Sequence, residues 1–250
     1  MAYTIAVAGK GGTGKTTLAA LIIGHLLKSD QKPILAVDAD PNSNLNEVLG
    51  ITFDQTVVST VDEIMDKKED LSPGITKERL LDYQLQDALV ESKGFDLLVM
   101  GRTEGPGCYC HANNLLRGFM EKLKGNYRDV VMDNEAGMEH LSRRTTRDVD
   151  TLLVTANPTP VALRSAKRIQ KTAGNLKLKI KKIYLVLNET GGDSRGEEKM
   201  EDVGLPLLGR IPYDEEIMER SIKAKSLLDL PESSVALQGV KEIMKKLEIL

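Results

Sequence analysis

The chain has 250 residues, of which 41% are hydrophobic and 28% are charged. This length and composition support a folded core, and they exclude a wholly disordered chain or a fibrous repeat. The 34 basic and 37 acidic side chains leave a formal net charge of −3, which argues against nucleic acid as a partner. No apolar run has the length of a membrane span, and the first residues lack the charged region of a secretory signal. We therefore expect a cytoplasmic protein.

Short apolar runs alternate with helix-forming stretches along the chain. Strands are predicted at Tyr3–Ala8, Pro33–Val37, Phe95–Met100, Asp129–Met132, Thr151–Thr155, Ile183–Leu187 and Leu207–Ile211. Helices are predicted at Lys15–Lys28, Lys77–Ser92, Leu115–Lys124, Pro160–Ala173 and Val235–Leu247. Strands that are apolar throughout are typical of a parallel sheet that is buried on both faces. The pattern predicts an α/β fold with a doubly wound, mainly parallel sheet, in a single domain over residues 1–250.

A glycine-rich loop lies between the first predicted strand and the first predicted helix. Its sequence satisfies the phosphate-loop pattern G-x-x-x-x-G-K-[ST] in the context that this pattern requires. The glycines allow backbone N–H groups to turn toward an anion, and the helix N-terminus adds its positive dipole end. Lys15 is expected to bridge the β- and γ-phosphates of a nucleotide, and the Thr16 hydroxyl to bind Mg²⁺. The expected nucleotide-binding residues of the loop are Gly9, Lys10, Gly11, Gly12, Thr13, Gly14, Lys15, Thr16 and Thr17.

Polar side chains follow several of the other predicted strands. Asp38 and Asp40 come after the second strand, and the run Val130–Asp133 is an apolar strand that ends in aspartate. Because ligands bind at the carboxyl ends of parallel strands, these carboxylates should lie beside the phosphate loop. Asp133 is expected to hold Mg²⁺ through water. An aspartate in such a position can also simply cap a helix, and this alternative stays open.

The two cysteines, Cys108 and Cys110, are separated by one residue in a loop that is rich in glycine and proline. Two thiolates from one chain cannot complete a tetrahedral metal site, whereas four from two chains about a twofold axis can. Thiolates suit Zn²⁺, Ni²⁺ or an iron–sulfur cluster, and the sequence does not choose among these. His111 is adjacent and is a further candidate ligand. A redox-active or merely buried cysteine pair is the alternative.

Four features occur together in this chain and carry a resemblance. They are Lys10 in the loop Lys-Gly-Gly-Thr-Gly-Lys-Thr-Thr, the run Asp-Ala-Asp-Pro-Asn-Ser-Asn-Leu-Asn at 38–46, the Cys-x-Cys loop, and Met-Asp-Asn-Glu-Ala-Gly-Met-Glu-His-Leu-Ser-Arg-Arg at 132–144. The loop resembles that of the MinD/ParA-like branch of P-loop ATPases, which includes the nitrogenase iron protein. The whole set resembles the CooC-type nickel-insertion ATPases of carbon monoxide dehydrogenase maturation.

The resemblance implies roles for individual residues. Lys10 would reach the partner's phosphates across a nucleotide-bridged homodimer, and Asp40 would position the attacking water. The implied catalytic residues are Lys10, Lys15 and Asp40, and the implied Mg²⁺ shell is Thr16, Asp38 and Asp133. Further nucleotide contacts are implied for Gly137 near the γ-phosphate and for Asn188 and Pro212 at the base.

The function that the resemblance implies is that of an ATP-dependent metallochaperone. ATP, hydrolysed to ADP with Mg²⁺, would drive dimerisation, and Cys108 and Cys110 would bind Ni²⁺ or Zn²⁺ across the dimer. The client would be carbon monoxide dehydrogenase or the related acetyl-CoA synthase. Two alternatives stay open: a MinD/ParA-type positioning or partition ATPase, and an iron–sulfur carrier or reductase of the same branch. Membrane members of the first class end in a basic amphipathic helix, but the apolar stripe near the C-terminus is expected to face the core.

Overall fold

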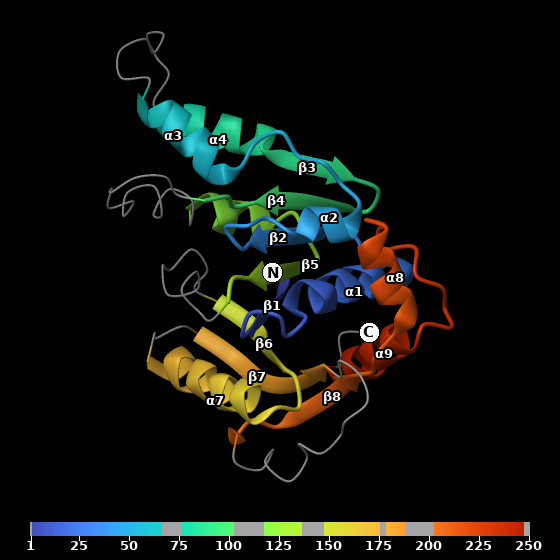
Figure 1. Ribbon diagram of the computed structural model, residues 1–250. Coiled ribbons are helices and arrows are strands. Elements are labelled where there is room, and N and C mark those ends of the chain that lie inside the picture. The colour runs from blue at the N-terminus through green and yellow to red at the C-terminus, as the bar shows by residue number, and fades with distance from the viewer. Residues whose placement is uncertain are drawn as a thin grey trace.

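The computed structural model describes residues 2–66, 77–102, 118–136, 148–175, 179–188 and 203–247 (Figure 1). Four candidate site residues of the sequence, Cys108, Cys110, His111 and Gly137, lie outside the described residues.

An eight-stranded sheet forms the centre of the described chain, with the strand order β3-β4-β2-β5-β1-β6-β7-β8. All neighbouring strands are parallel except β3 and β4. The strands are β1 (Tyr3–Gly9), β2 (Ile34–Ala39), β3 (Leu89–Ser92), β4 (Phe95–Val99), β5 (Asp129–Asn134), β6 (Asp148–Ala156), β7 (Lys179–Asn188) and β8 (Leu207–Ile211). The predicted doubly wound, mainly parallel sheet is thereby confirmed.

Helices cover both faces of this sheet (Figure 1). Apolar residues of α1 (Lys15–Lys28), α2 (Leu45–Leu49) and α9 (Val235–Lys246) form the core on one face. Those of α3 (Val57–Asp66), α4 (Lys77–Asp87), α7 (Pro160–Asn175) and a helix at 118–124 form the core on the other face. The central strands are apolar over most of their length because each of their two faces packs against helices.

One predicted helix is partly wrong. The expected helix Lys77–Ser92 ends at Asp87, and Leu89–Ser92 instead forms the edge strand β3. A two-residue turn reverses the chain between Ser92 and Phe95, and Gly94 in this turn has a φ of 91°, which favours glycine. Pairing with β4 thus overrides the local helical pattern, which a single-sequence pattern cannot anticipate.

The helix α8 (Glu215–Ile222) was not predicted, although its start carries a clear signal. The Asp214 side chain accepts a hydrogen bond from the Glu216 N–H at 3.0 Å, and two glutamates occupy the first turn. Such an N-cap with acidic residues stabilises a helix start. None of the residues of α8 is buried, and with eight residues the helix is too short for a long periodic pattern of apolar positions.

The C-terminal helix α9 packs into the core as expected. Its apolar residues Val240, Ile243 and Met244 are fully buried. Lys246 donates to the carbonyl of Leu208 at 2.7 Å, so part of its basic face is also engaged within the chain. No helix among the described residues is both long and apolar enough to cross a membrane.

Candidate functional site

The site is built at the carboxyl edge of the sheet, where the ends of neighbouring strands meet. The phosphate loop joins β1 to α1 at the centre of this edge. Asp38 on β2 and Asp133 on β5 lie on one side of it, and Thr155 on β6 and Asn188 on β7 lie on the other. The strand order therefore gathers side chains that are far apart in the sequence around one loop.

The phosphate loop leaves the helix N-terminus open to an anion. Gly12 and Gly14 have φ values of 77° and 83°, which turn the backbone in a way that favours glycine. The first turn of α1 has no acidic residue, and no side chain caps its N-terminus within the described structure. Lys15 is largely buried at this end, whereas Lys10 is exposed. Free N–H groups, a positive dipole and a lysine together suit a phosphate group.

The loop is held in place by β6. The Thr13 hydroxyl donates to the Lys10 carbonyl at 2.7 Å and lies 2.9 Å from the Thr155 hydroxyl oxygen. A Cβ atom at Gly9 would come within 2.4 Å of the same Thr155 oxygen, so only glycine allows this close approach. Thr155 was predicted only as the end of a strand, and its position at the carboxyl edge is the signal that could have singled it out.

Asp38 and Asp133 form a buried pair of carboxylates on adjacent strands. They are register partners between β2 and β5 and are 0% and 1% exposed. Burial raises the pKa of Asp133 to about 7, and the charge of Asp38 adds to the rise, while Thr16 and Lys15 oppose it. Burial likewise raises the pKa of Asp38 to about 6, against the effect of two backbone hydrogen bonds.

The two carboxylates differ in how their oxygens are satisfied. Asp38 accepts hydrogen bonds from the N–H groups of Asp40 at 3.1 Å and Leu45 at 2.8 Å. Neither oxygen of Asp133 has a hydrogen-bond partner within the part of the chain that the structure describes. A buried, unpaired carboxylate is costly unless something else binds it.

The donor set around Asp133 fits a Mg²⁺ ion. The unpaired carboxylate lies close enough to the Thr16 hydroxyl and the Lys15 ammonium for both to affect its pKa. Carboxylate and hydroxyl oxygens at the mouth of a phosphate loop are the hard ligands that Mg²⁺ prefers, together with water and phosphate oxygens. Each oxygen of Asp38 accepts one hydrogen bond from the backbone, so Asp38 also anchors the segment 40–45.

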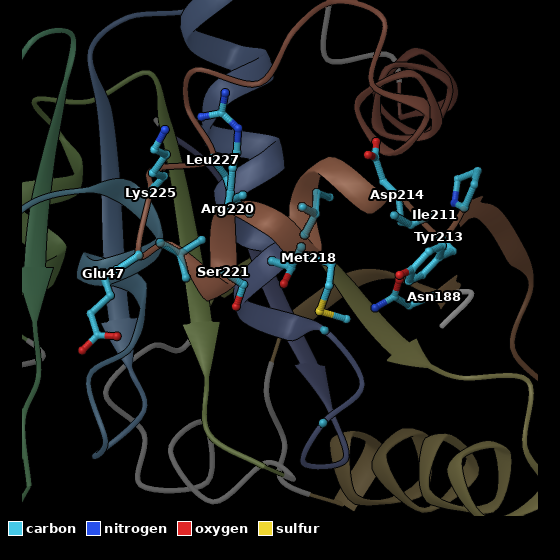
Figure 2. A pocket seen from close by; sticks show the side chains of 17 residues that line it. Glu47, Asn188, Ile211, Tyr213, Asp214, Met218, Arg220, Ser221, Lys225 and Leu227 are labelled. Carbon is cyan, nitrogen blue, oxygen red and sulfur yellow. The ribbon is translucent and has the colours of Figure 1, made fainter. Parts of the chain in front are cut away.

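A pocket of about 370 Å³ opens beside the phosphate loop (Figure 2). Gly14 and Thr17 line it from the loop and α1, and the segment that follows β8 lines it from the other side. Figure 2 shows Asn188 and Tyr213 near one end of this pocket, Glu47 and Lys225 near the other, and Met218 between the two ends. Pro212 also lines the pocket. The volume is within the range of small-ligand sites.

The amide of Asn188 has a defined orientation at the edge of the pocket. Its Nδ2 donates to the Thr13 carbonyl of the phosphate loop at 3.0 Å. Its backbone carbonyl accepts a hydrogen bond from Asn157 at 3.3 Å. Because a carbonyl can only accept, the amino group of Asn188 must face the loop, and its Oδ1 remains as an acceptor.

The structure thus brings together most of the predicted site residues, and it adds others. The same edge of the sheet contains the phosphate loop together with Asp38, Asp40, Asp133, Asn188 and Pro212. Thr155, Tyr213 and Met218 were not predicted. Tyr213 and Met218 are 44% and 48% exposed, and their place beside the pocket depends on α8, which the sequence pattern did not reveal.

This fold and this edge define a phosphate-loop nucleotide-binding protein, and comparisons with known proteins identify its family. Residues 4–227 match the family described as the CobQ/CobB/MinD/ParA nucleotide binding domain. The chain belongs to this family.

Individual relatives are similar over nearly the whole chain. An uncharacterised ATP-binding protein of Methanocaldococcus jannaschii is 43% identical over 247 residues, which cover 97% of each chain. The carbon monoxide dehydrogenase accessory protein CooC of Rhodospirillum rubrum is 29% identical over 245 residues, covering 90% of this chain and 89% of the relative. The structure of the septum site-determining protein MinD of Pyrococcus horikoshii, complexed with Mg-ADP, superposes with a TM-score of 0.71 at 23% identity, covering 99% and 96% of the two chains.

Proposed function

We propose that residues 1–250 form one cytoplasmic P-loop ATPase domain that hydrolyses ATP to ADP and phosphate with Mg²⁺. The observation that carries the proposal is the buried carboxylate of Asp133, unpaired within the described structure, beside Thr16 at the open N-terminus of α1. A bound Mg²⁺ would supply positive charge for the phosphates there. The relatives that are described as ATP-binding favour the same nucleotide.

In this proposal the phosphate loop binds the phosphates through its N–H groups, and Lys15 stabilises the charge that develops during hydrolysis. Asp40 orients the attacking water, and Gly137 faces the γ-phosphate. The exposed Lys10 is available to a second chain rather than to its own phosphate loop. Because the positive charge of Lys10 would reach the partner's phosphates only when two chains pair, ATP hydrolysis would be coupled to dimerisation.

The base is proposed to be adenine, bound next to Asn188 and Pro212. With its amino group donating to Thr13, Asn188 offers its Oδ1 to the pocket as an acceptor. An acceptor suits the exocyclic amino group of adenine and would be left unpaired against the carbonyl of guanine. Tyr213 and Met218 provide apolar surface near it.

The proposal is tested by phosphate release from ATP and GTP, with and without Mg²⁺. Wild-type protein should hydrolyse ATP in preference to GTP, and only when Mg²⁺ is present. The Lys15→Ala variant should hydrolyse ATP at least 100-fold more slowly, because removal of a charge-stabilising group typically has an effect of this order. Lys171→Ala, an exposed lysine on α7, is the matched control and should keep the wild-type rate. Equal rates for Lys15→Ala and wild type would refute the assignment.

We further propose that ATP-driven pairing serves metal delivery. The similarity to CooC and the Cys-x-Cys sequence at Cys108 and Cys110 support this role. Two such pairs would provide four thiolates for Ni²⁺ or Zn²⁺, with carbon monoxide dehydrogenase or acetyl-CoA synthase as the client. Since ATP can drive the transfer only by favouring one dimer state, metal affinity should depend on the nucleotide.

Metal content distinguishes this role from others. The double variant Cys108→Ser, Cys110→Ser should lose stoichiometric Ni²⁺ or Zn²⁺ and still hydrolyse ATP. Unchanged metal content in the double variant would exclude these cysteines as ligands.

A MinD/ParA-type positioning ATPase is the second candidate, and the likeness to MinD over nearly the whole chain supports it. Sedimentation with anionic liposomes in the presence of ATP separates the two functions. Nucleotide-dependent sedimentation without bound metal would favour positioning, and bound metal without sedimentation would favour metal delivery.

A further inference from the structure

The loop after β2 holds the carboxylate of Asp40 by hydrogen bonds from a single residue. The backbone N–H of Asn42 donates to Asp40 Oδ1 at 2.9 Å, and the Asn42 side-chain Nδ2 donates to the same oxygen at 2.9 Å. Asp38 anchors this loop, because its carboxylate accepts hydrogen bonds from the N–H groups of Asp40 and Leu45, which lie at the two ends of the loop.

These bonds leave the two oxygens of Asp40 in different states. Because a carboxylate oxygen can only accept, the amide of Asn42 must present its amino group, so its orientation is defined. Oδ1 is occupied twice, and Oδ2 has no hydrogen-bond partner among the described residues. The charge of Asp40 also acts on Asp133, which places the Asp40 carboxylate near the proposed Mg²⁺ site.

We infer that Asn42 is a positioning residue, whose side-chain amide holds Asp40 so that Oδ2 alone is presented to the attacking water. The inference rests on the proposed ATP hydrolysis, which it deepens. The hydrogen bond from Asn42 Nδ2 to Asp40 Oδ1 restricts rotation of the Asp40 carboxylate about its Cβ–Cγ bond. The carboxylate is therefore already oriented before the attacking water binds to it.

A role in shaping the turn would have a different signature. The turn is closed by backbone groups, since the N–H groups of Asn42 and Ser43 donate to the side chain and the carbonyl of Asp40. Aspartate is as suited to such a turn as asparagine. Replacing Asn42 by aspartate therefore preserves the turn, but it removes the Nδ2 donor and puts a second carboxylate beside Asp40.

The test is the rate and the KM of Mg²⁺-dependent ATP hydrolysis by Asn42→Ala and Asn42→Asp. Asn42→Ala should lower kcat about five- to tenfold, the effect of one lost hydrogen bond, with KM within about twofold of wild type. Asn42→Asp should lower kcat further than Asn42→Ala, again without a comparable change in KM. Asn126→Asp makes the same charge change at an exposed position at the opposite edge of the sheet, and it should leave both parameters unchanged.

Two results would overturn the inference alone: a kcat of Asn42→Asp equal to that of wild type, as a turn role requires, or a loss that appears wholly in KM. Asp40→Ala serves as the reference for loss of the carboxylate itself. If wild-type protein hydrolyses no ATP, the proposed function fails, and the inference about Asn42 fails with it. Normal turnover by wild type and a slow Asp40→Ala variant, with both Asn42 variants unaffected, would overturn the inference and leave the proposed function standing.

Discussion

At the scale of single residues, the buried carboxylates of Asp38 and Asp133 lower the stability of the fold, and they lie at the proposed Mg²⁺ site. Both carboxylates are buried, and burial raises both pKa values, that of Asp133 to about 7 and that of Asp38 to about 6. A folded carboxyl group with a raised pKa keeps its proton where the unfolded chain has lost it. Folding is therefore disfavoured progressively as the pH rises from the ordinary value of about 4 toward 7.

The Asp133→Asn variant should remove this dependence on pH. Without ligands, wild-type protein should lose free energy of unfolding between pH 5 and pH 8, and this loss should be smaller in the variant by about 1–3 kcal/mol, because one pKa unit corresponds to about 1.4 kcal/mol. Urea unfolding at both pH values measures the difference. The same variant should lose Mg²⁺-dependent ATP hydrolysis.

Asp129→Asn is the matched control for hydrolysis. Asp129 is also buried with a raised pKa, but it lies at the other end of β5, away from the phosphate loop. This variant should keep ATP turnover. An Asp133→Asn variant with the pH dependence of wild type would contradict a buried, protonated carboxyl group at position 133.

The sequence pattern identified the candidate phosphate- and Mg²⁺-binding residues more readily than the residues that hold the phosphate loop in place. Lys15, Thr16 and Asp133 belong to local patterns, because a phosphate loop and an apolar strand ending in aspartate can each be recognised within a few residues. Thr155 contacts Thr13 across 142 positions, and such a contact exists only once the strands are paired. The local sequence around Thr155 therefore gives no indication that Thr155 contacts Thr13.

At the scale of elements, β6 positions the phosphate loop through Thr155. The hydroxyl of Thr155 contacts that of Thr13, and its oxygen occupies the space that a side chain at Gly9 would need. The conformation of the phosphate loop thus depends both on its own glycines and on the neighbouring strand β6.

Replacing Thr155 by valine should weaken ATP binding. Valine keeps the shape of threonine but cannot hydrogen-bond, so we expect the Kd for ATP to rise about three- to tenfold, the effect of one hydrogen bond of ordinary strength. Calorimetric titration with ATP measures this change. Thr155→Ser retains the hydroxyl and should bind within about twofold of wild type, and a valine variant with unchanged affinity would show that the hydroxyl does not support the loop.

The bounds of two strands were predicted closely. The strand β1, which is buried almost throughout, differs by one residue from its prediction, and the partly exposed edge strand Leu207–Ile211 agrees at both ends. In contrast, β7 begins at Lys179, four residues before the predicted start. The added residues are largely exposed and polar, so they lack an apolar pattern, and they are strand because they pair with β6.

At the scale of the whole molecule, the described edge of the sheet contains a site for one nucleotide, while the proposed metal site requires two chains. The net charge of −3 argues against nucleic acid as a partner, and the apolar face of α9 is buried in the core. The exposed Lys10 beside the phosphate loop is the group that pairing would bring to the partner's phosphates.

The most direct test of ATP-driven pairing around a metal uses Asp40→Ala, which should bind ATP but hydrolyse it slowly. Light scattering combined with metal analysis, with Mg²⁺ and either ATP or ADP, measures pairing and coordination together. With ATP we expect twice the mass of one chain and one Ni²⁺ or Zn²⁺ ion for each pair. A single chain that carries its full complement of metal with ATP bound would contradict it.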